Sequence, residues 1–402
     1  MKLYRNLAPL ALSALLLAAC GGGDPYVPGS GSPAGAPTTK GNFTALISFG
    51  TSASDAGSYT PATAIPNIGT IGGKFTTNSP TGTVWVENFA TSLGLVITPA
   101  EVGFNGQSLK CPAGAANAAL AGTCTAYGQG GARVTDPNGV GHDPVTGAGA
   151  LTVPVTKQID NHLASATFGG KFNATDLIIV EGGLNDLFVQ MQIFGAAALQ
   201  IQTLAATGAI SVDEANRRLF DAQTTAQAAM KQAGLELAAA VRDKILAKGG
   251  KYVAVATMPD LGNTPFGNSA QVGAAKPVLT ALSATFNVWL REGLTNQPVQ
   301  ILDLFDFFNT VVANPTTYGM TNVTSPACDV AKISTITGGQ VATGSSLFCN
   351  STPGAIYNTL VTAPVAASAT TWLFADDVHP TTGGHKLLSD VATEKLKAFG
   401  WI

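Results

Sequence analysis

Charged side chains are scarce in this chain of 402 residues: Asp, Glu, Lys and Arg make up 11 % of it, whereas roughly 25 % is usual in a soluble domain. The 21 basic residues do not outnumber the 24 acidic ones, so the chain lacks the basic character that nucleic-acid binding requires. Its Gly-rich stretches do not have the spacing of phosphate-binding loops, and we predict no nucleotide cofactor. Hydrophobic residues still make up 46 %, which is enough for a sizeable core.

The N-terminus carries an apolar run, Leu7–Ala19, that is shorter than the roughly 20 residues needed to span a bilayer. It follows Lys2 and Arg5, as in a secretory signal peptide. The run ends in Leu-Ala-Ala-Cys20, which resembles a bacterial lipobox, in which the cysteine becomes lipidated. We therefore predict export from a bacterial cytoplasm. The protein would be lipid-anchored to the cell envelope, with the outer membrane favoured, or secreted. The alternative is an ordinary cleaved signal that ends near a cysteine.

Three regions follow from these features. Residues 1–19 form the predicted signal peptide, and residues 20–40 form a flexible linker that begins with the lipidated Cys20 and is rich in Gly and Pro. Residues 41–402 form one domain with loop insertions. Membrane contact is expected only through the anchor on Cys20, and no oligomeric state is predicted.

Cysteines are few, and no two have the CxxC spacing of a zinc site, so we predict no metal. An even number in the exported domain predicts two disulfides, and three pairings are possible. Proximity in the sequence favours Cys111 with Cys124 and Cys328 with Cys349.

Short apolar runs alternate with helical patterns along the domain. The expected strands are Phe43–Phe49, Asp176–Val180, Tyr252–Thr257 and Val299–Leu304. The expected helices are Val84–Leu93, 212–248, Pro277–Leu294 and Gly384–Phe399. This alternation predicts a parallel sheet covered by helices on both faces. The stretches 104–150 and 309–370 are expected to be long loop insertions.

Four blocks of polar residues and glycines lie between the expected strands and helices. They are Gly50–Gly57 (GTSASDAG), Gly130–Ala132 (GGA), Gly183–Asp186 (GLND) and Asp376–Thr381 (DDVHPT). In an open parallel sheet, reactive groups gather at the carboxyl ends of the strands. The blocks together contain a serine, a histidine and a carboxylate, which are the parts of an activated nucleophile. They also contain glycine amides and an asparagine that can stabilise an oxyanion. His142, His162 and His385 are rivals of His379 for the role of base.

The four blocks, in this order, resemble those of the SGNH hydrolases, also called GDSL lipases/esterases, in their exported bacterial branch. The resemblance covers roughly residues 43–400. It implies a three-layer α/β/α sandwich with a parallel sheet and flavodoxin-like topology. It also implies Ser52 as nucleophile, His379 as general base and Asp376 as the carboxylate that orients the histidine.

The resemblance further implies an oxyanion hole made by the N–H of Ser52, the N–H of Gly131 and the side chain of Asn185. Gly130 is an alternative to Gly131, and Asp377 is an alternative to Asp376. Thr51 departs from the family, which usually has Asp there. We expect Thr51 to organise the nucleophile turn more weakly than a carboxylate would.

The implied function is hydrolysis of carboxylic esters through an acyl-serine intermediate, in the manner of a lipase or esterase, with an acyl ester as partner and no cofactor. A phospholipase or acyltransferase, or a carbohydrate deacetylase, using the same site is the alternative among enzymes. A non-catalytic surface-binding lipoprotein that keeps the fold is the alternative outside them.

Overall fold

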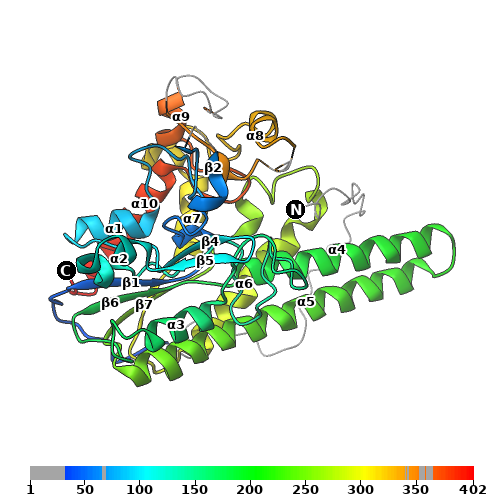
Figure 1. Cartoon of the computed structure of the whole chain (residues 1–402). Helices are drawn as coiled ribbons and strands as arrows, with labels where there is room; N and C mark the ends of the chain where they lie inside the picture. Colours follow the sequence, from blue (N-terminus) through cyan, green and yellow to red (C-terminus); the bar gives the residue numbers. More distant parts are fainter. Residues whose placement is uncertain (1–31, 66–68, 340, 342–343, 353–357, 359–364) are drawn as a thin grey trace.

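The structure, a computed structural model, describes residues 32–65, 69–339, 341, 344–352, 358 and 365–402 (Figure 1). The predicted signal peptide and Cys20 lie outside the described residues. Residues 32–40, the last part of the predicted linker, lie against the domain. The N–H of Ala34 donates to the carbonyl of Gln297 over 2.9 Å, and Trp401 Nε1 donates to the carbonyl of Pro37 over 2.6 Å. Residues 32–40 therefore pack against the domain instead of forming the flexible chain expected from the sequence, and the rest of the predicted linker lies outside the described residues.

The central sheet has four parallel strands in the order β1-β6-β7-β8. They are β1 (Ala45–Phe49), β6 (Asp176–Val180), β7 (Tyr252–Ala256) and β8 (Gln300–Leu302). These are the four strands expected from the sequence, with slightly shorter ends for three of them. Every residue of β6 and β7 is buried, which explains why both strands are continuous apolar runs after their first residue.

A short segment at residues 125–127 lies along the free edge of β1. Ala126 forms a parallel bridge with Ser48, and the N–H of Ser48 donates to the carbonyl of Thr125 over 3.0 Å. With this segment counted as the second strand, the order becomes 2-1-3-4-5, which is the flavodoxin-like order. In such a sheet the ligand site is expected between the carboxyl ends of β1 and β6, where the strand order reverses.

Helices cover both faces of the sheet, as Figure 1 shows. Alternate strand residues such as Ile47, Ile178 and Val253 join a core with α3 (Val155–Ala164), α5 (Val212–Ala240) and α6 (Lys276–Gly293). The intervening residues, such as Leu46, Leu177 and Ala254, join a second core with α1 (Trp85–Ser92), α7 (Leu304–Ala313) and α10 (Thr382–Ala398). The expected three-layer α/β/α sandwich is confirmed.

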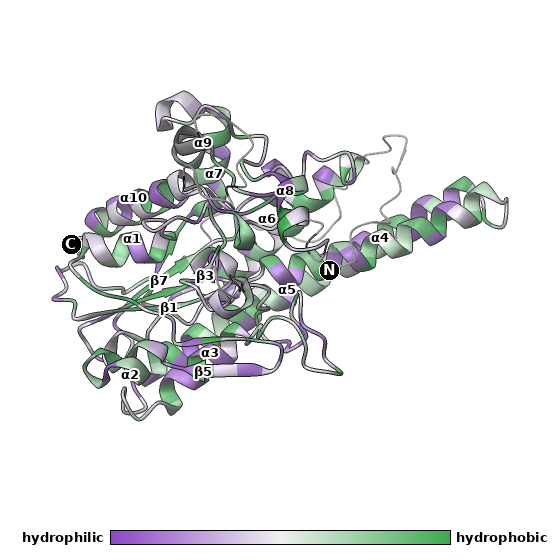
Figure 2. Ribbon diagram, turned by 45° about the horizontal axis from the view of Figure 1, so that its top comes forward, coloured by the Kyte–Doolittle hydropathy of each residue, from purple (hydrophilic) through white to green (hydrophobic). Residues whose placement is uncertain are grey.

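A long helical hairpin extends from the body of the molecule (Figure 2). It consists of α4 (Leu184–Ala206), which the sequence analysis did not predict, and α5. After Ala240, one π turn and one 3-10 turn continue the predicted 212–248 helix to Lys248. The α4 helix is long and apolar enough to cross a bilayer, and a third of its most apolar 18-residue stretch is buried. Helices in the core of soluble proteins also meet this test, so we draw no membrane topology from it.

The two insertions contain short elements. The first holds β5 (Gln107–Lys110), paired with β4 (Glu101–Phe104), and α2 (Pro112–Ala116). The second holds the end of α7, α8 (Val330–Ile336) and α9 (Val365–Thr371). A further antiparallel pair is β2 (Ala64–Ile65) with β3 (Gly69–Thr70). Disulfides join Cys111 to Cys124 and Cys328 to Cys349, with Cα–Cα distances of 5.3 and 5.9 Å. The pairing favoured by sequence proximity is confirmed.

His162, on α3, is buried and has no charged hydrogen-bond partner among the residues that the structure describes. Its ring stacks between Phe168 and Phe172, with centroids 4.4 and 4.8 Å away. Its Nδ1 lies 3.3 Å from the hydroxyl of Tyr127, and its Nε2 has no partner among the described residues. Burial lowers the pKa of His162 from its ordinary 6.5 to about 4.

This histidine should make the fold sensitive to mild acid. Below pH 6.5 the unfolded chain protonates at His162, whereas the folded chain does not until about pH 4, so stability falls as the pH falls. We expect the free energy of unfolding of the wild type, relative to His162→Phe, to drop by about 2 kcal/mol between pH 7 and pH 5. Urea titrations at the two pH values measure the difference. Parallel pH dependence in the two proteins would contradict the assignment.

Candidate active site

The nucleophile turn begins where β1 ends. Thr51 has an extended backbone, and Ser52 opens a single 3-10 turn to Ser54, in which the N–H of Asp55 donates to the carbonyl of Ser52. Only 5 % of Ser52 is exposed. The turn places this serine at the carboxyl end of β1, next to the carboxyl end of β6, at the point where the strand order reverses.

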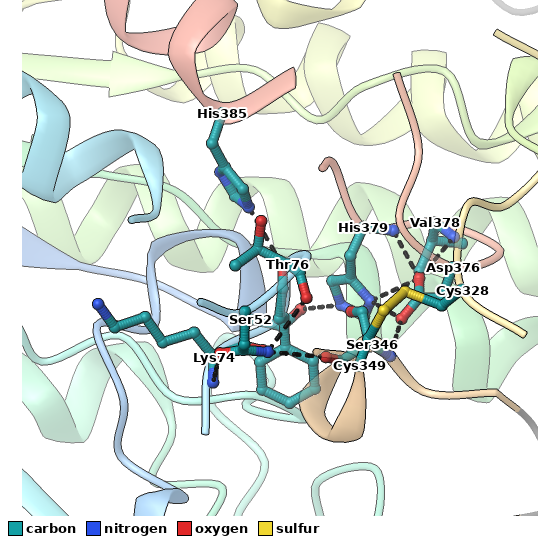
Figure 3. A network of polar contacts seen from close by, with 12 residues as sticks. Ser52, Lys74, Thr76, Cys328, Ser346, Cys349, Asp376, Val378, His379 and His385 are labelled. Carbon is teal, nitrogen blue, oxygen red and sulfur yellow. Dashed lines mark hydrogen bonds and ion pairs between the residues drawn. A yellow bond between two sulfur atoms is a disulfide. The ribbon is translucent and has the colours of Figure 1, made fainter. Parts of the chain in front are cut away.

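Ser52, His379 and Asp376 form a continuous chain of hydrogen bonds (Figure 3). Ser52 Oγ lies 2.7 Å from His379 Nε2, and His379 Nδ1 lies 2.8 Å from the nearer oxygen of Asp376. A carboxylate only accepts hydrogen bonds, so it holds the proton of the neutral ring on Nδ1. Nε2 is then left with a lone pair toward the serine. This is the arrangement by which a histidine takes a proton from a serine.

The loop before α10 explains why Asp376 and His379 meet. The N–H groups of Val378 and His379 donate to one oxygen of Asp376 over 3.0 and 2.8 Å, so the carboxylate closes a tight turn around itself. Thr381 ends the loop by accepting a hydrogen bond from the N–H of Gly384 and capping α10. The spacing of three residues therefore suffices to bring the carboxylate of Asp376 to the ring of His379.

Asp376 is held as a carboxylate. Burial alone would raise its pKa, but the charge of His379 and the hydrogen bonds from His379 and Ser346 outweigh burial and hold the pKa of Asp376 well below its usual range. The N–H of Ser346 donates to the second oxygen over 2.7 Å. The neighbouring Asp377 has an exposed side chain. The geometry therefore brings Asp376, not Asp377, to the histidine.

The Cys328–Cys349 disulfide lies beside this carboxylate (Figure 3). The N–H of Cys328 donates to the carbonyl of Ala375 over 2.9 Å, and the N–H of Cys349 donates to the carbonyl of Ser346 over 3.0 Å. The disulfide thus ties together the residue before Asp376 and the residue whose amide binds Asp376.

Loss of this disulfide should therefore affect activity as well as stability. We expect the double variant Cys328→Ala/Cys349→Ala to lose about 2–5 kcal/mol of stability and several-fold in kcat. The matched control Cys111→Ala/Cys124→Ala should lose stability but keep kcat, since neither cysteine contacts the site. Chemical denaturation and steady-state kinetics measure both effects. An equal kcat for both double variants would contradict the coupling.

The three rival histidines are engaged elsewhere. His162 is enclosed in the core as described above. His142 Nδ1 lies 2.9 Å from the carbonyl of Ala150. His385 accepts from the N–H of Trp85 through Nδ1 and lies 3.1 Å from the carbonyl of Phe75 through Nε2, and burial lowers its pKa to about 3. Of the four histidines, only His379 contacts Ser52.

The glycine block supplies one free amide. The N–H of Gly130 is occupied by a 2.9 Å hydrogen bond to Asp55. Within the described residues, neither Gly131 nor Ser52 has a partner for its N–H. Gly131 has a φ of +81°, and a Cβ there would lie 2.1 Å from the carbonyl oxygen of Val140, so only glycine fits. One N–H of the Asn185 amide donates to the carbonyl of Ala132 over 2.8 Å. Its second N–H has no partner within the described residues and is available to an oxyanion.

Two carboxylates that the sequence analysis did not assign tie the blocks together. Asp55 is fully buried and joins the nucleophile block to Gly130. Asp186 accepts from the N–H of Val134 and pairs with Arg133, joining the third block to the two residues that follow the second. Arg133 therefore binds a carboxylate beside the glycine block. Phe75 packs against His379, with ring centroids 4.7 Å apart.

An apolar pocket opens beside Ser52 and His379. Its floor and walls include Met258 and Leu261, which follow β7, and Leu304, Phe308 and Val312, which lie on α7. Almost all of the side chains around it are uncharged. In the described part of the chain, no cluster of three or more His, Cys, Asp or Glu side chains could hold a metal ion.

Comparison with known proteins agrees with this geometry. The family model of the GDSL-like lipases/acylhydrolases matches residues 46–392, which is most of the chain and includes all four blocks. No curated protein matches the chain. Because the family model spans the sheet, the nucleophile turn and the Asp376–His379 loop, the chain belongs to the GDSL-like lipase/acylhydrolase family.

Proposed function

We propose that this chain, a member of a family of ester-type hydrolases, cleaves carboxylic esters through an acyl-serine intermediate. The observation that carries the proposal is the hydrogen-bond chain from Ser52 through His379 to Asp376. A serine becomes a nucleophile when an oriented base accepts its proton. Ser52 and Asp376 are buried and His379 is partly buried, which strengthens the electrostatic interactions among these three side chains.

The first half of the reaction acylates the serine. Ser52 Oγ attacks the carbonyl carbon of the ester as its proton passes to His379 Nε2. The N–H groups of Ser52 and Gly131 and the amide of Asn185 stabilise the resulting oxyanion. The tetrahedral intermediate collapses, the bond to the alcohol breaks, and the alcohol leaves with the proton from His379.

The second half restores the enzyme. Water attacks the acyl-serine carbonyl, and His379 takes one of its protons. The second tetrahedral intermediate collapses, Ser52 Oγ leaves with that proton, and the carboxylic acid is released. Throughout, Asp376 stabilises the positive charge that forms on the histidine ring.

The apolar pocket suggests which ester is cleaved. Met258, Leu261 and Phe308 offer a hydrocarbon surface beside the reacting serine. Each CH₂ group of an acyl chain that is buried there stabilises the bound substrate by about 0.8 kcal/mol. This favours an acyl chain over the acetyl group of a carbohydrate ester. We therefore propose a lipase or esterase activity on acyl esters.

A series of p-nitrophenyl esters tests the substrate class. We expect kcat/KM to rise from acetate to butyrate and octanoate on the protein without residues 1–19. A preference for acetate that extends to acetylated sugars would replace the lipase proposal with a carbohydrate deacetylase. Transfer of the acyl group to an added alcohol in preference to water would replace it with an acyltransferase.

Asn185→Ala tests the oxyanion hole. The variant removes one donor, and we expect kcat to fall by roughly 10²–10³ with little change in KM. The amide also binds the carbonyl of Ala132, so a thermal melt must accompany the kinetics. A fall confined to KM would make Asn185 a ground-state binding residue instead.

We also propose that the protein is exported and lipidated on Cys20. Two disulfides favour an oxidising compartment, and Cys20 follows a signal-like run. Growth of expressing cells with a labelled fatty acid should mark the wild type but not Cys20→Ser. Incorporation into neither protein would contradict the anchor.

A further inference from the structure

Glu181, one residue beyond the end of β6, directly contacts the nucleophile turn. Its carboxylate accepts a hydrogen bond from the N–H of Thr51 and another from the Thr51 hydroxyl, whose Oγ1 lies 3.0 and 3.1 Å from the two carboxylate oxygens. Thr51 is only 1 % exposed and immediately precedes Ser52. Both polar hydrogens of Thr51 therefore depend on one carboxylate, which comes from a strand 130 residues away in the chain.

The carboxylate of Glu181 occupies space that only a glycine leaves open. A Cβ on Gly50 would lie 2.2 Å from Glu181 Oε1 and 2.8 Å from Cδ. Gly50 cannot move aside, because Gln158 accepts from its N–H over 2.9 Å and donates to its carbonyl over 2.8 Å. Gly50 is thus required by the close approach of Glu181.

We propose that Glu181 is the positioning residue of the nucleophile turn and that it supplies from the end of β6 the carboxylate that the family usually carries at position 51. The inference rests on the proposed function, because Glu181 acts through Ser52. By holding the N–H and hydroxyl of Thr51, it fixes the direction in which the chain leaves β1. That direction sets the place of Ser52 Oγ relative to His379 and the direction of the Ser52 N–H.

The residues around Glu181 hold its carboxyl group in one place. Burial raises the pKa of Glu181, and hydrogen bonds from Thr51 and Ser54 partly oppose that rise. Ser54 in turn accepts a 3.1 Å hydrogen bond from Trp85 Nε1. The carboxyl group is therefore held by the very turn that it orients.

The exchange of a carboxylate between positions 181 and 51 gives a reciprocal test. Glu181→Ala should lower kcat by about tenfold to hundredfold, since two buried donors on Thr51 lose their acceptor. KM should change by less than about threefold, because Glu181 is only one of the residues that line the acyl pocket and its apolar side chains, such as Met258 and Phe308, are unchanged. Thr51→Asp alone should also lower kcat, because a second carboxylate would face Glu181 at short range. Thr51→Asp/Glu181→Ala should recover kcat to within about tenfold of the wild type.

Matched variants separate positioning from folding. Asp176→Ala removes a buried carboxylate from the opposite end of the same strand, so it should lower the melting temperature without lowering kcat. Gly50→Ala should lower kcat in the wild type but cause no further loss in the Glu181→Ala background. If Glu181→Ala does not fold, Glu181→Gln, with and without Thr51→Asp, replaces it in the same scheme.

The kinetics of the wild type and the variants on p-nitrophenyl butyrate decide the outcome. Recovery of kcat in the Thr51→Asp double variant supports the inference. Wild-type kcat in Glu181→Ala, or equal losses from Thr51→Asp in both backgrounds, would overturn it. A wild type that is inert and resists fluorophosphonate labelling would instead overturn the proposed function, and the two failures are distinguished in one experiment.

Discussion

Ser52→Ala should abolish the hydrolysis of every ester that the wild-type protein cleaves, with a fall in kcat on the order of 10⁴–10⁶. The hydroxyl oxygen lost is the atom that would carry the acyl group, and no other side chain contacts His379 Nε2 through a hydroxyl in the described structure. Stability should change by only about 1 kcal/mol, since a single hydrogen bond to a partly exposed histidine is lost. Steady-state kinetics and a thermal melt measure the two quantities.

Ser54→Ala is the matched control for this substitution. Ser54 lies two residues further along the same turn and accepts a hydrogen bond from Trp85 Nε1, but it does not contact His379. Ser54 also helps to hold Glu181, so we expect kcat to fall by no more than about tenfold, far less than in Ser52→Ala. The opposite result, with Ser54→Ala inactive and Ser52→Ala active, would show that the nucleophile has been assigned to the wrong serine.

Asp376→Asn should lower kcat by about 10⁴, the scale for a triad carboxylate replaced by an amide. The N–H groups of Ser346, Val378 and His379 all donate to this side chain, and the amide NH₂ cannot accept any of them. If that NH₂ faces the ring, it donates to Nδ1 and shifts the ring proton to Nε2. The base would then have no lone pair for the proton of Ser52.

The control for this prediction is Asp377→Asn, one residue further on. Residue 377 is exposed, and the hydrogen bonds of His379 Nδ1 go to the carboxylate of Asp376 instead, so kcat should remain close to the wild-type value. The two variants are compared by kcat on one ester at a fixed pH, with a melting temperature for each. A loss of activity in Asp377→Asn with normal activity in Asp376→Asn would reverse the assignment.

The sheet and the meeting of Ser52, His379 and Asp376 could be predicted from the sequence because their signals are local. The buried strand Asp176–Val180 is a continuous apolar run, and Asp376 and His379 lie within one short motif. The α4 helix was missed because its apolar residues surround the helix instead of forming one stripe. The α7 helix was not predicted because it begins directly after a strand, and its last residues fall in the stretch 309–370 that was expected to be a loop insertion.

The supporting carboxylates could not be predicted, since each acts across a long separation in the chain. Glu181 meets Thr51 across 130 residues, and Asp55 meets Gly130 across 75. A single acid after a strand has no spacing that marks its partner. Only the packing of the carboxyl ends of β1 and β6 side by side brings Glu181 to the nucleophile turn.

The most direct test of an activated serine is labelling with a fluorophosphonate, followed by mass spectrometry of the intact protein and its peptides. The probe reacts with a serine only when a base has made it nucleophilic. We predict one adduct per chain, on the peptide that contains Ser52, and none in Ser52→Ala. A wild-type protein that is folded but unlabelled, or an adduct on Ser54, would contradict the account.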